Sequence, residues 1–296
     1  MLVITGSTGN VGAELVELLA RQATGEPWRI AGRDTGTVLL SDPHGATPEV
    51  ATLDFFNRAT WGPVLAGVRC LFLLFPLPGN RAAREAIVPF LHAAEDAGCQ
   101  HVVYVSVFGA DRARFIPHHT VETALRSSSM SYTVLRCSFF MQNLHRAIST
   151  HGVDIADRGE VFVPAGAGRT TFLDARDAAA VAALALRHPD QHHDLVHHLT
   201  GPAALTMTEV AAALTRALGY PVSYTHPSLI AFARRLRRRG AGWDSIGFMA
   251  AVYTLTRLGH NQPLTNDVAR LLGRPPRTLD DFLSDNAWRW RDHAWT

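Results

Sequence analysis

Short apolar runs alternate along the first half of the chain with longer segments in which apolar residues recur at every third or fourth position. The short runs are typical of strands buried on both faces of a parallel sheet, and the longer segments are typical of amphipathic helices. Strands are predicted at 2–4, 28–32, 50–55, 68–75, 101–107 and 132–137, and helices at 13–21, 57–67, 81–98 and 118–128. This alternation predicts the α/β class, with a doubly wound parallel sheet.

The pattern of the first half continues through the strand predicted at 132–137 and the helix after it, and it changes from Gly152. We expect a helix over 138–150 that carries Phe139, Phe140, Met141 and Asn143, followed by a short hairpin of 153–155 with 160–163. A helix at 174–187, a strand at 195–199, a helix at 207–218 and a strand at 221–224 are expected next, and the remainder is expected to be helical. We therefore predict a larger domain, 1–151 together with about 170–200, and a smaller, mainly helical cap domain, 152–169 with 201–296.

A glycine motif joins the first predicted strand to the first predicted helix. Its three glycines have the spacing G-x-x-G-x-x-G. Glycine lets the backbone approach a pyrophosphate, whose charge is favoured by the N–H groups and the dipole at a helix N-terminus. The motif predicts a dinucleotide site with contacts from Gly6, Thr8, Gly9, Asn10, Val11 and Gly12. The alternative is a glycine-rich turn without a ligand.

The residue after the second predicted strand indicates which dinucleotide is bound. Arg33 follows Gly32, and its guanidinium can pair with the 2′-phosphate of NADP. NADP(H) is therefore the predicted cofactor, although Asp34 leaves binding to the ribose of NAD open. Ligands of such sheets bind at the carboxyl ends of the strands. Further cofactor contacts are therefore expected from Asp54, Phe55, Phe75, Pro76, Ser106 and Val107.

Composition and charge limit the classes of binding partner and of catalytic mechanism that we expect. The 296-residue chain has a formal net charge of +2, which gives no reason to expect nucleic acid or an anionic membrane surface. No apolar run is long enough to span a bilayer, and because strand-forming residues start at position 2 we expect no signal peptide. The 3 cysteines have no metal-ligand spacing and are expected to be reduced and buried in a cytoplasmic protein. All 28 residues of the Lys+Arg total are arginine, so mechanisms that need a lysine amine are excluded.

Several longer stretches make the chain resemble the NmrA-like group of atypical short-chain dehydrogenases/reductases. They are 6–12 (GSTGNVG), 101–111 (HVVYVSVFGAD), 132–144 (YTVLRCSFFMQNL), 172–177 (FLDARD), 199–210 (LTGPAALTMTEV) and 271–282 (LLGRPPRTLDDF). The resemblance implies an NAD(P)-binding Rossmann fold with a small C-terminal domain. It also implies that the glycine loop and Arg33 bind NADP, and that the segment from Cys137 to Phe140, including Phe139, lines the nicotinamide.

The chain departs from the wider superfamily in its catalytic positions. The resemblance implies a serine on the fifth strand and a tyrosine and a lysine four residues apart on the following helix. With Glu122 as the landmark, Arg114 occupies the tyrosine position and His118 the lysine position. Ser106 stands one residue from the expected serine, Val107 takes its place, and Cys137 replaces the usual proline.

Two histidines of the predicted helix at 118–128 are the candidate catalytic residues. Histidine titrates near neutrality, so His118 or His119 can serve as a general acid. The alternative is that one of them caps the helix and the other faces solvent. Tyr253 is a second candidate proton donor, and Tyr253 and Trp243 lie on a predicted helix, where they serve as packing residues or stack on a flat substrate.

Two charged or titratable clusters are given structural interpretations. The histidines at 192, 193, 197 and 198 lack an accompanying carboxylate set, so we expect surface histidines and no metal. The arginine run at 234–239 contains apolar residues and is expected to be a solvated helix face that does not bind nucleic acid.

These features predict an NADPH-dependent reductase for a small apolar, conjugated or aromatic acceptor such as a quinone, an enone or an iminium. Substrate contacts are expected from Leu77, Phe140, Asn143 and Trp243, with few polar groups. Direct hydride transfer to such acceptors needs mainly proximity and a dry site. The alternatives are an NADP(H)-binding regulator or redox sensor, and a non-redox cyclase or isomerase on the same fold. A homodimer is compatible with all three.

Overall fold

The computed structural model describes residues 1–21, 26–33, 48–74, 79–145 and 150–291. The chain forms two compact units. The first consists of Met1–Cys137 and Ala175–Leu199, and the second of Ser138–Asp174 and Thr200–Thr296. Among the described residues, no helix combines the length and the apolar character needed to cross a membrane. Phe75, Pro76, Leu77 and Asp34 lie outside the described residues.

The first unit is built on a 7-stranded parallel sheet of order β10-β6-β5-β4-β1-β2-β3. This order, which grows outward in both directions from β1, confirms the predicted doubly wound sheet. Its strands are β1 (Leu2–Thr5), β2 (Trp28–Gly32), β3 (Glu49–Thr52), β4 (Cys70–Leu74), β5 (His101–Val107), β6 (Ser131–Cys137) and β10 (Leu195–Leu199).

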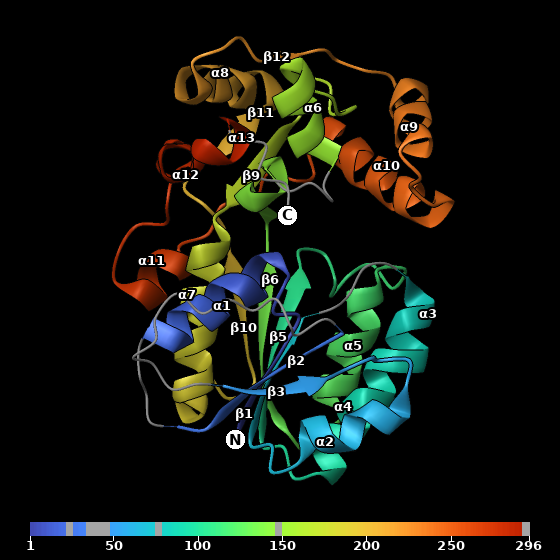
Figure 1. Cartoon of the computed structure of the whole chain (residues 1–296), viewed down its shortest axis with the longest axis vertical. Helices are drawn as coiled ribbons and strands as arrows, with labels where there is room; N and C mark the ends of the chain where they lie inside the picture. Colours follow the sequence, from blue (N-terminus) through green and yellow to red (C-terminus); the bar gives the residue numbers. More distant parts are fainter. Residues whose placement is uncertain (22–25, 34–47, 75–78, 146–149, 292–296) are drawn as a thin grey trace. The chain divides into compact units, whose positions relative to one another are not determined.

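Helices cover both faces of this sheet, as Figure 1 shows. One face carries α1 (Asn10–Arg21) and α7 (Ala175–Arg187). The other carries α2 (Trp61–Leu65), α3 (Asn80–Ala82), α4 (Val88–Asp96) and α5 (Pro117–Arg126). A π-helical segment, Ala83–Ile87, joins α3 to α4 next to Pro89, which has no amide hydrogen to donate. The core between sheet and helices includes Leu71, Tyr104 and Phe90, each with no exposed area.

The second unit has a small sheet and most of the remaining helices. Its 3-stranded sheet has the order β11-β9-β7, and β8 pairs separately with β12. These strands are β7 (Phe139–Phe140), β8 (Glu160–Val161), β9 (Arg169–Leu173), β11 (Ala204–Thr206) and β12 (Ser223–Tyr224). Its helices are α6 (Thr150–Arg158), α8 (Met207–Leu218), α9 (Leu229–Arg238), α10 (Trp243–Arg257), α11 (Asp267–Leu272), α12 (Leu279–Asn286) and α13 (Trp288–Arg291).

Two predicted elements of the second unit are wrong. Residues 138–150 are not one helix, because Phe139 and Phe140 form β7 and a 3₁₀ turn follows at Met141–Leu144. The predicted hairpin is also wrong, because 153–155 belong to α6 and β8 pairs in parallel with β12. Gly159, with φ of 60°, ends the helix where a hairpin turn was expected.

The predicted third strand is shorter than expected. It ends at Thr52, because Asp54 turns the chain: its Oδ1 accepts the Phe56 amide at 2.9 Å.

The cysteines are reduced and buried, as the sequence predicts. Cys70, Cys99 and Cys137 are all buried, and none of the three forms a disulfide.

Candidate functional site

The turn between β1 and α1 is so tight that Gly6 and Gly12 require glycine, and a β-carbon on Gly9 would displace a neighbouring side chain. Gly6 has φ of 66°, and its carbonyl accepts the Gly9 amide at 2.8 Å. A β-carbon on Gly12 would lie 2.0 Å from Gly6 O, and one on Gly9 would lie 2.4 Å from Leu74 Cδ2. The chain therefore forms the predicted strand, glycine turn and helix, with the N-terminus of α1 directly after the turn.

Thr5 connects β1, the strand before this turn, to the neighbouring strand β4 by hydrogen bonds. Its Oγ1 donates to Phe72 O at 3.0 Å and accepts the Leu74 amide at 3.1 Å. Both contacts join β1 to β4 at their carboxyl ends. They hold Leu74 in place beneath Gly6 and Gly9.

Three predicted cofactor residues follow β2 and β3. Arg33 is exposed and comes directly after β2, so its guanidinium is available to a ligand at this edge of the sheet. Asp54 is half-buried and uses one carboxylate oxygen in the turn after β3. The Phe55 ring packs edge-on against Phe90, with ring centroids 5.0 Å apart, and so belongs to the core.

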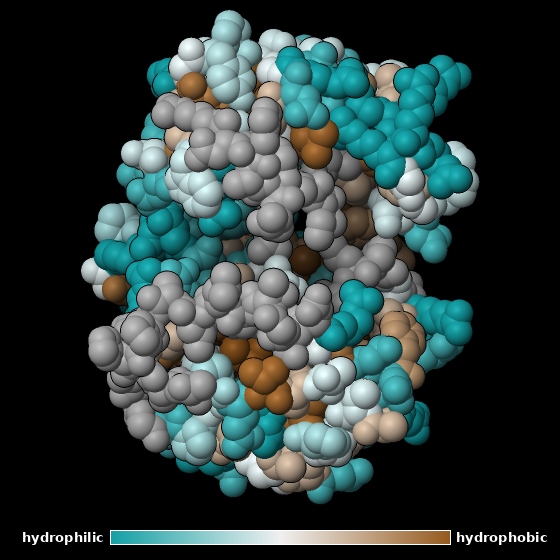
Figure 2. Space-filling model, in the orientation of Figure 1, coloured by the Kyte–Doolittle hydropathy of each residue, from teal (hydrophilic) through white to brown (hydrophobic). Residues whose placement is uncertain are grey.

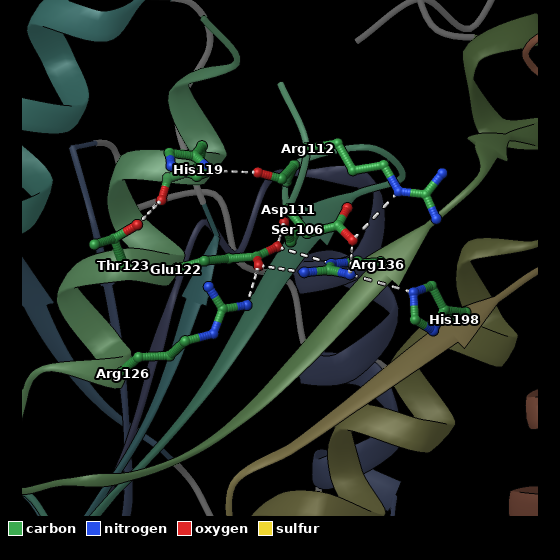
Figure 3. A network of polar contacts seen from close by, with 10 residues as sticks. Ser106, Asp111, Arg112, His119, Glu122, Thr123, Arg126, Arg136 and His198 are labelled. Atoms are coloured by element: carbon green, nitrogen blue, oxygen red, sulfur yellow. Dashed lines mark hydrogen bonds and ion pairs between the residues drawn. The ribbon is translucent and has the colours of Figure 1, made fainter. Parts of the chain in front are cut away.

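A buried carboxylate, Glu122 of α5, connects the helix to β5 and β6 (Figure 3). Its Oε1 accepts Ser106 Oγ at 2.6 Å, and its Oε2 accepts Arg136 Nη2 at 2.6 Å and Arg126 Nη2 at 2.7 Å. Burial alone would raise the pKa of Glu122, but the hydrogen bonds from Arg136 and Ser106 outweigh it and the pKa is lowered. The Ser106 hydroxyl is thereby directed at a structural carboxylate.

Arg136 extends this network of polar contacts to Asp111 and to His198 of β10. Its Nη1 lies 3.3 Å from Asp111 Oδ2 and 3.3 Å from His198 Nε2. A guanidinium has no acceptor, so in this contact His198 accepts through Nε2 and carries its proton on Nδ1. The Glu122–Arg136 pair was not predicted from the sequence; the strand register that makes Ser106 and Arg136 partners brings Arg136 to this carboxylate.

The two candidate histidines of α5 differ in their surroundings. His118 is 7% exposed and lies on the buried face of the helix together with Glu122. Burial lowers the pKa of His118 to about 4, so the expected titration near neutrality is wrong for this residue. His119 is half-buried, and its Nδ1 donates to Ala110 O at 2.7 Å, which leaves Nε2 as the acceptor in the neutral ring.

The residues at the end of β5 and β6 are mostly enclosed. Val107 is half-buried, and Cys137 is 4% exposed with its thiol 3.5 Å from Leu135 O. Burial raises the pKa of the Cys137 thiol, which keeps it protonated and unreactive.

The candidate residues of the second unit range from buried to exposed. Phe139, Phe140 and Asn143 are half-buried. Trp243 is 67% exposed, and the Arg237 guanidinium lies 5.5 Å from its ring centroid. Tyr253 is 2% exposed and its hydroxyl lies 2.6 Å from His151 Nε2, which favours the packing role over that of a proton donor.

The clustered histidines and arginines are more deeply embedded than expected. His192 and His197 are buried, with Nδ1 and Nε2 3.1 Å apart, so the surface prediction is wrong for these two. Within the described ranges, no group of three or more His, Cys, Asp or Glu residues is arranged to hold a metal. Hydrophilic side chains gather over α9 in Figure 2, but Arg235 and Arg239 pair with the buried Asp154 at 2.8 Å and 2.5 Å. The arginine run is therefore solvated only in part.

Comparison with known proteins shows to which family the chain is similar. Residues 1–257 match the family model described as the NmrA-like family. The chain is 31% identical to an NAD(P)H azoreductase of Xenophilus azovorans, over 97% of this chain and 98% of that protein. It is 30% identical to the uncharacterized oxidoreductase YesF of Bacillus subtilis, over 100% of this chain and 98% of that protein.

A solved structure confirms the fold. The NADPH-dependent quinone oxidoreductase of Escherichia coli, solved in complex with NADPH, superposes with a TM-score of 0.79. The two chains are 24% identical, and the match covers 96% of this chain and 99% of that one.

Proposed function

The chain belongs to the NmrA-like family, and from this premise we propose that it is an NADPH-dependent reductase that transfers hydride to a small conjugated or aromatic acceptor. The observation that carries the proposal is the glycine turn, in which the spaces beside Gly9 and Gly12 are too small for a β-carbon. Relatives named as an azoreductase and an oxidoreductase support the reaction class.

The residues around the glycine turn fit a dinucleotide phosphate cofactor. The backbone of Gly6 to Gly12 and the N-terminus of α1 would hold the pyrophosphate, with Thr8 and Asn10 beside it. Arg33 would pair with the 2′-phosphate that distinguishes NADPH from NADH. When bound, the cofactor supplies the hydride.

The candidate catalytic positions of α5 favour an acceptor that needs little help with protonation. The sequence contains no lysine, so the tyrosine–lysine pair of the wider superfamily is not formed. His118 is neutral at physiological pH and can donate a hydrogen bond but not act as an acid near neutrality. Quinones, azo compounds and enones accept hydride directly and take their proton afterwards, from solvent.

The first test is NADPH oxidation, followed by absorbance, with a panel of a quinone, an azo dye and an enone. We expect oxidation with at least one of them and none with a simple ketone, which needs a proton in the transition state. Absence of turnover with the whole panel, in a protein that still binds NADPH by calorimetry, would instead favour the regulator or the non-redox enzyme.

A further inference from the structure

A buried hydrogen-bonded pair, His151 and Tyr253, lies in the second unit. Tyr253 Oη is 2.6 Å from His151 Nε2, although the residues belong to different helices, α6 and α10. His151 is 4% exposed and Tyr253 is 2% exposed. The pair therefore forms in the interior, without competition from water.

Aromatic rings enclose this pair. The Phe139 ring lies edge-on to the His151 ring, with centroids 5.8 Å apart, and Phe232 packs in the same way against Tyr253. Phe139 also contacts Phe172 edge-on at 5.4 Å, which continues the aromatic surface across β7 and β9. Phe139 is half-buried, so it is the member of this group nearest to solvent.

One ring nitrogen of His151 has no hydrogen-bond partner among the residues that the structure describes. This atom is Nδ1, which is buried, and Thr170 Oγ1 is likewise buried without a partner in that part of the chain. Thr170 stands two positions before Phe172 on β9, so both side chains leave the same face of that strand. Unsatisfied buried polar atoms are rare in folded proteins, and a functional role is one of the explanations for them.

The hydrogen-bond count fixes which nitrogen of His151 carries the proton. If Tyr253 donates to Nε2, the imidazole hydrogen is on Nδ1 and only that N–H lacks a partner. If Nε2 donates instead, both the phenol hydrogen and the Nδ1 lone pair are left without partners. The first arrangement leaves fewer buried polar groups unsatisfied and is therefore the stable one.

The pair is neutral and does not work as an acid. Burial lowers the pKa of His151 to about 4, against a smaller opposing effect of Asp154, and burial also raises the pKa of Tyr253. Donating the Nδ1 proton would leave an anion in this apolar surrounding. Nδ1–H is therefore suited to hold a hydrogen bond without giving up its proton.

We propose that the Nδ1–H of His151 binds the hydrogen-bond-accepting atom of the substrate, a carbonyl oxygen or an azo nitrogen, while the aromatic part of the substrate lies against Phe139 and Phe172. The inference rests on the proposed function and narrows its substrate class. An aromatic compound without an acceptor atom would leave the buried N–H unpaired and is selected against.

Two substitutions of His151 separate this role from a structural one. In His151→Asn the amide nitrogen stands near the position of Nδ1, and in His151→Gln it stands near that of Nε2. The full-length protein is titrated with naphthoquinone and with naphthalene in the presence of oxidised NADP, so that no hydride is available. Binding is followed by calorimetry.

We expect His151→Gln to lower the ratio of naphthoquinone to naphthalene affinity about tenfold, which corresponds to one hydrogen bond. His151→Asn should keep the ratio within about threefold of the native value, since it keeps a donor at the Nδ1 position. The opposite order, with His151→Gln native-like and His151→Asn impaired, would show that the contact with Tyr253 is what matters and would overturn the proposal.

A measurement on the native protein covers the case in which neither variant folds. Nitrogen NMR of histidine-labelled protein distinguishes the two neutral tautomers. We expect the Nδ1–H form for His151 and a shift of that signal with naphthoquinone but not with naphthalene. An Nε2–H form, or no response to the quinone, would contradict the inference. If the native protein prefers naphthoquinone to naphthalene as expected but does not oxidise NADPH, the proposed reductase activity is contradicted and the binding role of His151 is not.

Discussion

Gly12 lies so close to Gly6 that a β-carbon on Gly12 would come within 2.0 Å of the Gly6 carbonyl oxygen. The obstructing atom belongs to the backbone, so it cannot turn away as a side chain can. Gly12→Ala must therefore open the turn that precedes α1. We expect NADPH binding to weaken by more than about tenfold and the protein to lose about 1–3 kcal/mol of stability.

A matched control for this substitution is Gly62→Ala in α2. A β-carbon at Gly62 meets no atom within 4 Å, and alanine favours a helix. Calorimetry should give a native NADPH affinity for this variant, with unchanged or slightly increased stability in urea. Native NADPH binding by Gly12→Ala would mean that the turn does not hold the cofactor.

Arg33 should determine the choice between the two nicotinamide cofactors. It is exposed directly after β2, where it can donate charge-assisted hydrogen bonds to a 2′-phosphate. Arg33→Ala should weaken NADPH binding by about 1.5–3 kcal/mol and leave NADH binding nearly unchanged. Arg216→Ala, which removes an exposed arginine of the second unit, serves as the control. Equal calorimetric affinities of the native protein for NADH and NADPH would contradict this assignment.

Removal of the Glu122 carboxylate should destabilise the first unit strongly. Glu122→Ala leaves the buried Arg136 side chain without its main partner, at a cost of about 3–5 kcal/mol. Because the pKa of Glu122 is lowered in the folded state, its contribution is present above the ordinary glutamate pKa and is lost as the pH falls through the lowered value.

Urea unfolding at several pH values tests both statements. Glu17→Ala, which breaks an exposed pair with Arg21, should change stability by less than about 1 kcal/mol. A similarly small effect of Glu122→Ala would show that the network contributes little.

The strands of the first unit could be predicted because their signal is local. The apolar run at 101–107 forms β5 with the expected bounds, and the run at 195–199 forms β10. The helix at 207–218 was equally clear, since Thr206 and Glu209 form a capping box and Gly219 ends α8 with φ of 78°.

The failures lie where distant residues decide the local structure. Phe139 and Phe140 form a strand because they pair with Phe172 and Leu173, which no local pattern reveals. The site shows the same limit. No local pattern reveals that Ser106 donates to Glu122, or that His151 meets Tyr253 from 102 positions away.

His118 should make the stability of the protein depend on pH between about 4 and 6.5. The folded-state pKa is about 4, below the ordinary value of 6.5, so the unfolded chain binds the proton more readily in this range. Stability therefore falls as the pH falls from 6.5 toward 4, by about 1 kcal/mol per pH unit from this residue. His118→Leu should remove this part of the slope in urea titrations, and the exposed His193→Leu should not. An unchanged slope in His118→Leu would show that His118 is not buried in its neutral form.

The catalytic contribution of His118 should be modest and independent of pH. Because burial holds its pKa at about 4, the side chain is neutral throughout the range in which NADPH is stable, and it can orient an acceptor but cannot protonate it. We therefore expect His118→Ala to lower turnover of a quinone by about tenfold, with the same factor at pH 6 and pH 8 and with little change in NADPH affinity.

His119→Ala is the matched control variant, because the His119 ring is half-buried and hydrogen-bonded to Ala110 O. A loss of about 10²–10⁴ in His118→Ala that disappears as the pH rises would identify a general acid instead. Full activity in both variants would show that neither histidine takes part in catalysis, and that the rate comes from holding the acceptor close to the nicotinamide.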